Sequence, residues 1–201
     1  MRKQYLFILF TTLSLIGCNK KTDNDADSVY YTETEFRKAY ITGYGQYYLD
    51  KGIERQVMMI DLFSDRLDQD SIGKLVGSGT NFGFTDVFVD SYMREVKLPL
   101  GETVKRLYIP DGTYTADTTS AAFTFLPGMN FDGLPTGAFL QSVNSGARRD
   151  LWLFDSGQFD VVNEGDTTDL TATLNYKNNR GRQLTYQAHY RGVPVILRRQ
   201  Q

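Results

Sequence analysis

Two residues that occur only once limit the chemistry that this chain could perform. His189 is the only histidine, so a serine-histidine-aspartate arrangement or a zinc site would have to be built around it alone. Its neighbours at alternate positions, Gln187 and Arg191, favour a surface histidine on a polar strand face. Cys18 is the only cysteine, which excludes an intrachain disulfide and, because it precedes the folded part, thiol catalysis within it. We therefore predict no catalytic residue.

Carboxylates are the second group that could perform chemistry. Two acids about 5 to 9.5 Å apart can hydrolyse a glycosidic bond, but nothing singles out a pair among the 24 acidic residues. Three acids resemble the start of an EF-hand loop that lacks its glycine: Asp23, Asp25 and Asp27. A second cluster favours a solvated loop, with a weak cation site as the alternative: Asp65, Asp68 and Asp70. We predict no metal site and no cofactor.

Aromatic side chains give the remaining signal of binding. The chain has 13 Tyr, 13 Phe and one Trp. Four tyrosines gather around two glycines: Tyr40, Tyr44, Tyr47 and Tyr48. Exposed aromatic faces can stack on sugar rings, although core packing is an alternative use of the same residues. We predict Tyr44, Tyr47 and Tyr48 as ligand-binding residues. We expect Trp152, in a run that is apolar on both faces, to lie in the core.

The N-terminus has the organisation of a signal peptide. A short basic start, residues 1–4, precedes residues 5–16, which are apolar apart from two threonines and a serine. A membrane-spanning helix needs about 20 mostly apolar residues, so this stretch is too short to remain as an anchor. It ends in the sequence Leu15-Ile16-Gly17-Cys18.

This ending resembles the lipobox of bacterial lipoproteins. The resemblance implies that cleavage follows Gly17 and that Cys18 then carries a diacylglycerol and an acyl chain such as palmitate. Each buried methylene contributes about 0.8 kcal/mol, so two or three chains anchor a protein firmly. The alternative is an ordinary signal peptide that is removed together with Cys18. We expect an outer-membrane lipoprotein of the cell envelope, whose exposure at the cell surface stays open.

Charge and length describe the part that would remain after cleavage. Residues 18–201 carry 20 basic and 24 acidic side chains, a formal charge of about −4, which does not favour nucleic acid as a partner. The length suits one domain. We expect residues 1–17 to be the signal peptide, the polar residues 18–35 to be a lipidated flexible tether, and residues 36–201 to be the folded domain.

The folded part has the pattern of an all-β protein. Short apolar or alternating runs are separated by turn residues at roughly ten-residue spacing. Residues 170–176 and 184–190 alternate on either side of a turn, which predicts an antiparallel hairpin with one wet face. We expect an antiparallel β-sandwich, with a closed β-barrel as the alternative. Two segments should interrupt the strands, a helical turn at 71–76 and a long loop at 125–137.

Further strands are expected across the domain, at residues 39–49, 56–63, 84–89, 95–98, 114–116, 122–126, 138–143 and 151–154. The lipobox, the acidic tether and two strand runs together resemble small β-sandwich lipoproteins of the Bacteroides type. The two runs are Pro110-Asp111-Gly112-Thr113-Tyr114 and Phe154-Asp155-Ser156-Gly157-Gln158-Phe159. The resemblance implies an envelope location and a binding or structural role, and only Cys18 carries over by position.

Three functions are consistent with these features. The first hypothesis is a non-catalytic binding module for glycan or peptide, held to the membrane by its lipid anchor, with a glycan or an envelope protein as partner. The second is a structural or adhesive surface subunit, similar to a fimbrial subunit, whose strands pair with another copy. The third is a carboxylate-dependent hydrolase, which would require two acids that converge in an aromatic cleft.

Overall fold

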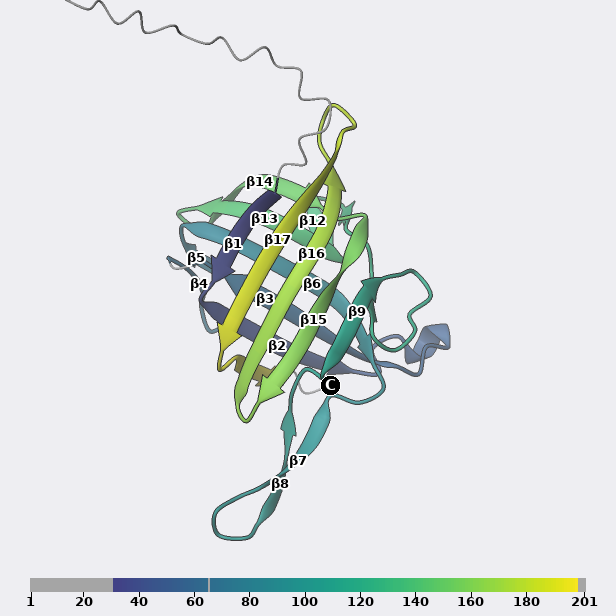
Figure 1. The fold of residues 1–201 in the computed structure, drawn as a ribbon, viewed down its shortest axis with the longest axis vertical. Coiled ribbons are helices and arrows are strands. Elements are labelled where there is room, and N and C mark those ends of the chain that lie inside the picture. Colours follow the sequence, from purple (N-terminus) through teal and green to yellow (C-terminus); the bar gives the residue numbers. More distant parts are fainter. Residues whose placement is uncertain (1–30, 65, 199–201) are drawn as a thin grey trace, which may run out of the picture.

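The computed structural model describes residues 31–64 and 66–198, and this part of the chain is all-β, as expected (Figure 1). No helix in these ranges is long and apolar enough to cross a membrane. The strands are β1 Tyr31–Phe36, β2 Lys38–Gly45, β3 Gln56–Phe63, β4 Leu67–Gln69, β5 Leu75–Gly77, β6 Gly79–Val89, β7 Met93–Lys97, β8 Thr103–Leu107, β9 Gly112–Ala116, β10 Thr124–Phe125, β11 Met129–Phe131, β12 Leu134–Thr136, β13 Ala138–Asn144, β14 Ala147–Leu153, β15 Ser156–Glu164, β16 Thr167–Lys177, β17 Gln183–Gly192 and β18 Val195–Arg198. One 3-10 helix, Leu49–Lys51, follows β2.

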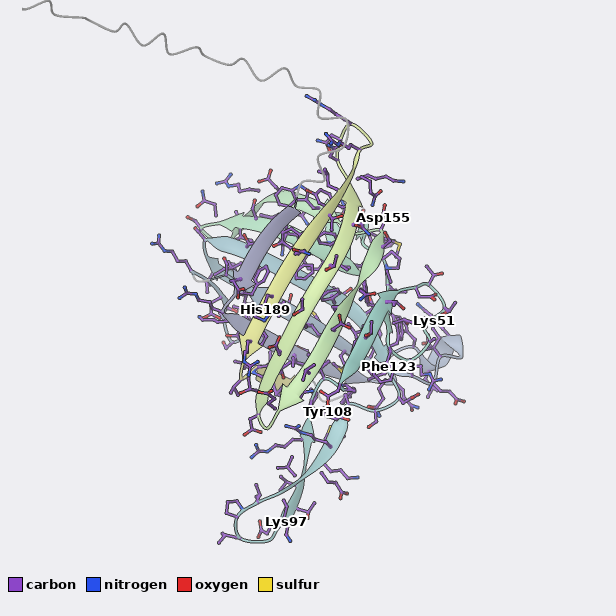
Figure 2. All side chains as sticks on the ribbon, in the orientation of Figure 1. Lys51, Lys97, Tyr108, Phe123, Asp155 and His189 are labelled. Atoms are coloured by element: carbon purple, nitrogen blue, oxygen red, sulfur yellow. The ribbon has the colours of Figure 1, made fainter. Side chains whose placement is uncertain are left out.

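Most of these strands belong to one mixed sheet that curls into a half-barrel. Its order is β1-β17-β16-β15-β9-β10-β6-β3-β2-β18, and β13 adds to β6 and carries β14. The pairs β1–β17, β9–β10 and β2–β18 are parallel, so the expectation of a purely antiparallel sheet was wrong. Separate two-stranded hairpins are β4–β5, β7–β8 and β11–β12. Figure 1 shows β7–β8 extending away from the body, with Lys97 near its end in Figure 2.

The first two and the last two strands of the described chain lie together where the sheet folds over. Only Arg37 separates β1 from β2, and only Val193 and Pro194 separate β17 from β18. Because β1 pairs with β17 and β2 pairs with β18, the same two segments stay together on both sides of the bend. Proline has no backbone N–H to donate to a ladder, which suits the interruption. Figure 1 shows the resulting layers, with β1, β17, β16 and β15 crossing in front of β2, β3 and β6.

The main core lies between these layers and is rich in aromatic rings. Side chains alternate across a strand, so one face of each strand can supply this core. The predicted C-terminal hairpin is confirmed, since Leu174 of β16 and Tyr186 of β17 are buried and face each other in register. The Phe84 and Phe159 ring centroids lie 4.5 Å apart. Full burial of each such ring contributes about 1.5–3 kcal/mol relative to exposure, which compensates for the absence of disulfides.

Three expected boundaries change. The tether was expected to reach residue 35, but β1 already pairs with β17 from Tyr31 onward, so residues 31–35 belong to the domain. A helical turn was expected at residues 71–76, but these residues form the turn of the β4–β5 hairpin and the first two positions of β5. The expected loop at 125–137 contains the β11–β12 hairpin. The predicted signal peptide, Gly17 and Cys18 lie outside the described residues, as do the acids of 23–27 and Asp65.

Candidate functional site

A cleft of about 610 Å³ lies against the face of β2 and β3 that is turned away from the main core. Tyr40, Thr42 and Tyr44 occupy alternate positions of β2, so they share this face, whereas Ile41 between them is buried in the core. From β3, Asp61 stands opposite Tyr40 in register, and Met59 stands opposite Thr42. These two cross-strand pairs and Tyr44 form the floor of the cleft, which we call the tyrosine cleft.

The turn of the β4–β5 hairpin, residues 69–73, forms a wall of the tyrosine cleft. Asp70 Oδ1 accepts hydrogen bonds from the backbone N–H groups of Ile72 at 3.0 Å and Lys74 at 2.9 Å, the pattern by which aspartate stabilises a turn. Leu67 and Leu75 anchor the hairpin through a small second apolar cluster that also contains Phe63 and Val143. The wall is therefore held by packing as well as by hydrogen bonds.

Tyr40 is fixed in place by contacts on two sides. Its ring lies 5.5 Å from the Phe63 ring, and its hydroxyl donates a 2.6 Å hydrogen bond to Asp68 Oδ1. The bond to Asp68 and partial burial raise the pKa of Tyr40 to about 12. Lys38 pairs with Asp68, and the bonds from Lys38 and Tyr40 keep the pKa of Asp68 below its usual value. Asp68 thus already has a cation, which argues against the weak cation site considered for the 65–70 cluster.

Asp61 is a buried carboxylate within the tyrosine cleft, with only 5% of its surface exposed. Asn81 Nδ2 donates to Asp61 Oδ1 at 3.0 Å, and Gln141 Nε2 donates to Asn81 Oδ1 at 2.7 Å. Burial raises the pKa of Asp61 to about 6, and the bond from Asn81 opposes part of that rise. Within the described residues, no basic side chain forms an ion pair with Asp61. A buried anion of this kind is typical of functional sites.

The three predicted ligand-binding tyrosines form a chain of ring contacts but have different positions. Tyr44 lines the cleft, and its ring lies 5.8 Å from that of Tyr47, which is 59% exposed. Tyr48 contacts Tyr47 at 4.9 Å, but its hydroxyl donates to Asp86 at 2.6 Å. Lys51, labelled in Figure 2, lies 4.7 Å from the Tyr48 ring centre. Tyr48 therefore bonds within the protein and does not line the cleft, whereas Tyr44, whose hydroxyl donates to Met59 Sδ at 3.4 Å, lines the cleft and Tyr47 lies beside it.

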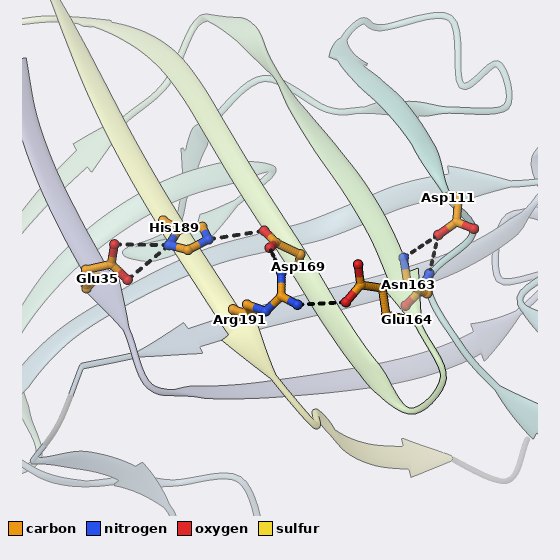
Figure 3. A network of polar contacts seen from close by, with 7 residues as sticks. All are labelled: Glu35, Asp111, Asn163, Glu164, Asp169, His189 and Arg191. Atoms are coloured by element: carbon orange, nitrogen blue, oxygen red, sulfur yellow. Dashed lines mark hydrogen bonds and ion pairs between the residues drawn. The ribbon is translucent and has the colours of Figure 1, made fainter.

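His189 lies elsewhere, in a surface network of charged groups (Figure 3). Its Nδ1 is 3.0 Å from both carboxylate oxygens of Glu35, and its Nε2 is 3.1 Å from Asp169 Oδ1. Arg191 bridges Asp169 at 2.8 Å and Glu164 at 2.7 Å. Burial lowers the pKa of His189, but the bonds and charges of Glu35 and Asp169 outweigh it and raise the pKa. These contacts link β1, β17 and β16, so the network supports the sheet.

A second cleft, of about 680 Å³, lies between β14 and the turn that joins β16 to β17. Its lining includes Arg149, Trp152, Lys177 and Arg180. Trp152 was expected in the core; it is half-buried, packing against the core while also lining this cleft. This basic cleft contains no buried ionisable group like Asp61, so the tyrosine cleft is the stronger candidate for a ligand site.

Sequence reasoning missed the polar residues at the base of the site. Asp61 lies within the apolar run of 57–63, Asn81 directly precedes the apolar run of β6, and Gln141 interrupts the buried face of β13. A polar residue inside an otherwise apolar strand was the available signal. No family model matches the chain, and neither a curated protein nor a solved structure is significantly similar to it.

Proposed function

We propose that the protein is a glycan-binding lipoprotein of the cell envelope, and that the tyrosine cleft is its binding site. The observation that carries this proposal is the placement of Tyr40 and Tyr44 on one strand face beside the carboxyl group of Asp61. A sugar ring has an apolar face that packs on aromatic rings and hydroxyl groups that require polar partners. A cleft of about 610 Å³ lies within the range of small-molecule sites.

Binding without catalysis is supported by the state of the acids around the cleft. A glycosidase needs a pair of carboxylates that act on the same bond. Of the two acids that line the tyrosine cleft, Asp70 holds the turn through its bonds to Ile72 and Lys74. Among the described residues of the lining, Asp61 is then the one carboxylate that is not used to stabilise a turn. A single carboxylate favours a binding role over carboxylate-dependent hydrolysis.

We include in this proposal that the protein is attached to the membrane by a lipid and that its fold is a β-sandwich. The lipobox at residues 15–18 supports attachment to the outer membrane through a lipid on Cys18 after cleavage behind Gly17. A β-sandwich is favoured over a closed barrel because β14 pairs only with β13 within the described residues, whereas a closed barrel has no free edge. A lipid-anchored sandwich would present its clefts to soluble glycan while it remains on the membrane.

The test is a glycan-array screen of a soluble chain of residues 19–201, which lacks the signal peptide and Cys18. We compare the wild type with Tyr44→Ala, which removes a ring of the cleft, and with Phe131→Ala as the matched control. Phe131 is an aromatic residue of β11 that is 74% exposed and lies outside the cleft lining. We expect selective binding that falls at least about tenfold in Tyr44→Ala, which corresponds to roughly 1.4 kcal/mol or more, and is unchanged in Phe131→Ala.

Two results would reject the glycan proposal. One is the absence of binding across the array by a chain whose circular dichroism spectrum shows a folded β-protein. The other is an equal loss of binding in both variants, because this would place the contact outside the tyrosine cleft. Tyr47→Ala extends the test to the rim, and we expect a smaller loss there because Tyr47 contacts Tyr44 but does not line the cleft.

A structural or adhesive subunit is the second candidate, and the free edge of β14 favours it. The basic cleft is lined by five consecutive residues of β14, Arg149 to Leu153, so it runs along the backbone of this edge. An extended strand from another copy could add there by backbone hydrogen bonds. Sedimentation velocity over a hundredfold range of concentration tests this candidate. A monomer at every concentration contradicts it, whereas growing polymers support it.

A further inference from the structure

We infer that the ligand of the tyrosine cleft is a glycan that carries a protonated amine, and that Asp61 is the residue that pairs with the ammonium group. This inference rests on the proposed glycan-binding function and narrows its ligand class from sugars in general to amino sugars with a free amine. It begins from the placement of one buried carboxyl group at the base of a cleft and from the side chains that surround it.

Asp61 has no cation partner among the described residues. It is 95% buried, and no basic side chain of the described residues pairs with it. Lys38 is close in the fold, but it is engaged by Asp68. An ionised carboxylate in such a place is unfavourable unless a cation or several hydrogen bonds compensate for lost hydration. An ammonium group that enters with the ligand would supply the missing charge.

The tyrosine cleft as a whole carries negative charge. Among the described residues, its lining contains two carboxylates, Asp61 and Asp70, and no lysine, arginine or histidine. A cleft lined by charges of one sign attracts ligands of the opposite sign and repels those of the same sign. The lining therefore disfavours uronic acids and sulfated sugars, and it favours a cationic sugar. The basic cleft beside β14 has the reverse charge and would not suit the same ligand.

Two aromatic rings share the cleft with Asp61. Tyr40 stands opposite Asp61 across the β2–β3 pair, and Tyr44 lines the same face of β2. Aromatic faces attract cations as well as sugar rings, so these side chains suit both parts of an amino sugar. Tyr40 is held by Asp68 and Phe63, and Tyr44 is held by its contact with Tyr47. The rings are thus positioned before a ligand arrives, which favours affinity.

Buried amides hold the carboxyl group of Asp61 through one of its two oxygens. Asn81 donates to Asp61 Oδ1 and is oriented by Gln141, so two buried amides support the carboxylate from neighbouring strands. Asp61 Oδ2 accepts no hydrogen bond from the described residues, and Asp61 lines the cleft, so this oxygen is available to a donor from the ligand. Amides that orient one oxygen and leave the other free are a suitable arrangement for a charge-assisted hydrogen bond to an ammonium group.

The test compares two β-1,4-linked oligosaccharides of equal length, one of glucosamine and one of N-acetylglucosamine, by isothermal titration calorimetry at pH 7. The two probes differ in the amine that the inference requires. We use the soluble chain of residues 19–201, its Asp61→Asn variant and Asp132→Asn as the matched control. Asp132 is exposed in the turn between β11 and β12, so this control makes the same change of charge outside the cleft.

We expect the wild type and Asp132→Asn to bind the glucosamine oligosaccharide at least tenfold more tightly than its acetylated counterpart. In Asp61→Asn this preference should disappear, while affinity for the acetylated sugar is retained. The wild-type comparison needs no variant, so it decides the question even where Asp61→Asn fails to fold. Equal affinity for both sugars, or a preference that Asp61→Asn retains, overturns the amine inference and leaves the glycan proposal standing. Binding of neither oligosaccharide overturns the amine inference, and absence of binding across the glycan array overturns the glycan proposal as well.

Discussion

Asn81 Nδ2 donates a 3.0 Å hydrogen bond to Asp61 Oδ1 across two neighbouring strands, β6 and β3. Gln141 on β13 extends the contact into a row of three polar side chains on adjacent strands of the curled sheet. Buried polar groups are nearly always hydrogen-bonded because the cost of leaving them unpaired is large. The hydrogen bonds of this row therefore compensate for part of the cost of burying the Asp61 carboxyl group.

Removal of the central amide should weaken the fold. In Asn81→Ala, Asp61 Oδ1 and Gln141 Nε2 both lose their partner, so we expect the free energy of unfolding to fall by about 1–3 kcal/mol. The pKa of Asp61 should also rise, because the bond from Asn81 is what lowers it. Urea denaturation measures the first effect, and NMR titration of the Asp61 carboxyl carbon measures the second.

The matched control for this prediction is Asn130→Ala. Asn130 is exposed on β11, and substitutions of this kind usually change stability by less than about 0.5 kcal/mol. If Asn81→Ala is as stable as the control, the row of amides contributes nothing to the fold.

Asp61→Asn should stabilise the unliganded protein, and the gain should depend on pH. The folded-state pKa of Asp61, about 6, exceeds the ordinary value of 3.8, so the folded state holds the proton more tightly than the unfolded chain. Wild-type stability should therefore fall as pH rises from about 4 to about 6 and stay lower above that window. Asparagine does not titrate, so the variant gains up to roughly 3 kcal/mol at pH 8 and little at pH 4.

Thermal or urea unfolding at several pH values measures this difference. An acid kept for a ligand, at some cost to stability, would behave in this way. A variant that is less stable than the wild type at pH 8 would instead assign Asp61 a structural role and would weaken the argument for an ammonium partner. Asp132→Asn again serves as the control, because it makes the same change of charge at an exposed position outside the cleft.

Much of the fold could be predicted because side-chain alternation reports which face of a strand is buried. Leu170 and Tyr190, for example, are buried as their alternating positions predict. Alternation does not report which strands are neighbours. The parallel pairs β1–β17 and β2–β18 join opposite ends of the chain, and only the three-dimensional fold brings those segments together. The same limit explains why residues 31–35 were interpreted as tether.

The candidate site was predictable only in part. The tyrosine cluster was visible as a local concentration of aromatic residues, and Tyr44 and Tyr40 do line the cleft. Asp61 was one acid among 24, and its meaning comes from burial and from Asn81, which is distant in sequence. Because the site depends on contacts between β3, β6 and β13, the sequence of any one strand does not identify it. The same reason explains why Trp152 was expected in the core: its apolar run does not show that one side of the strand lines a cleft.

Gly83 should be essential for the packing of β6 between β3 and β13. A Cβ at this position would lie 2.4 Å from Phe139 Cζ, closer than carbon atoms approach. Gly83→Ala should therefore displace a buried ring and cost about 1–3 kcal/mol, even though alanine is the better strand residue. Chemical denaturation measures the change. The control is Gly165→Ala, where no atom lies within 4 Å, and any loss there reflects only its positive φ of 65°.

His189 should make the attachment of β1 depend on pH. Glu35 and Asp169 raise its pKa above the ordinary 6.5, so its stabilising effect is fully present below about 6.5 and is lost as pH rises through the folded-state pKa. His189→Gln should therefore cost about 0.5–1 kcal/mol at pH 5.5, and much less at pH 9, because the side chain is 31% exposed and partly screened. Hydrogen exchange should show faster exchange of the β1 amides in the variant at the lower pH. Thr171→Ala, opposite His189 in register, does not titrate and should show no such pH dependence; an equal effect in both variants would contradict a charge-based link.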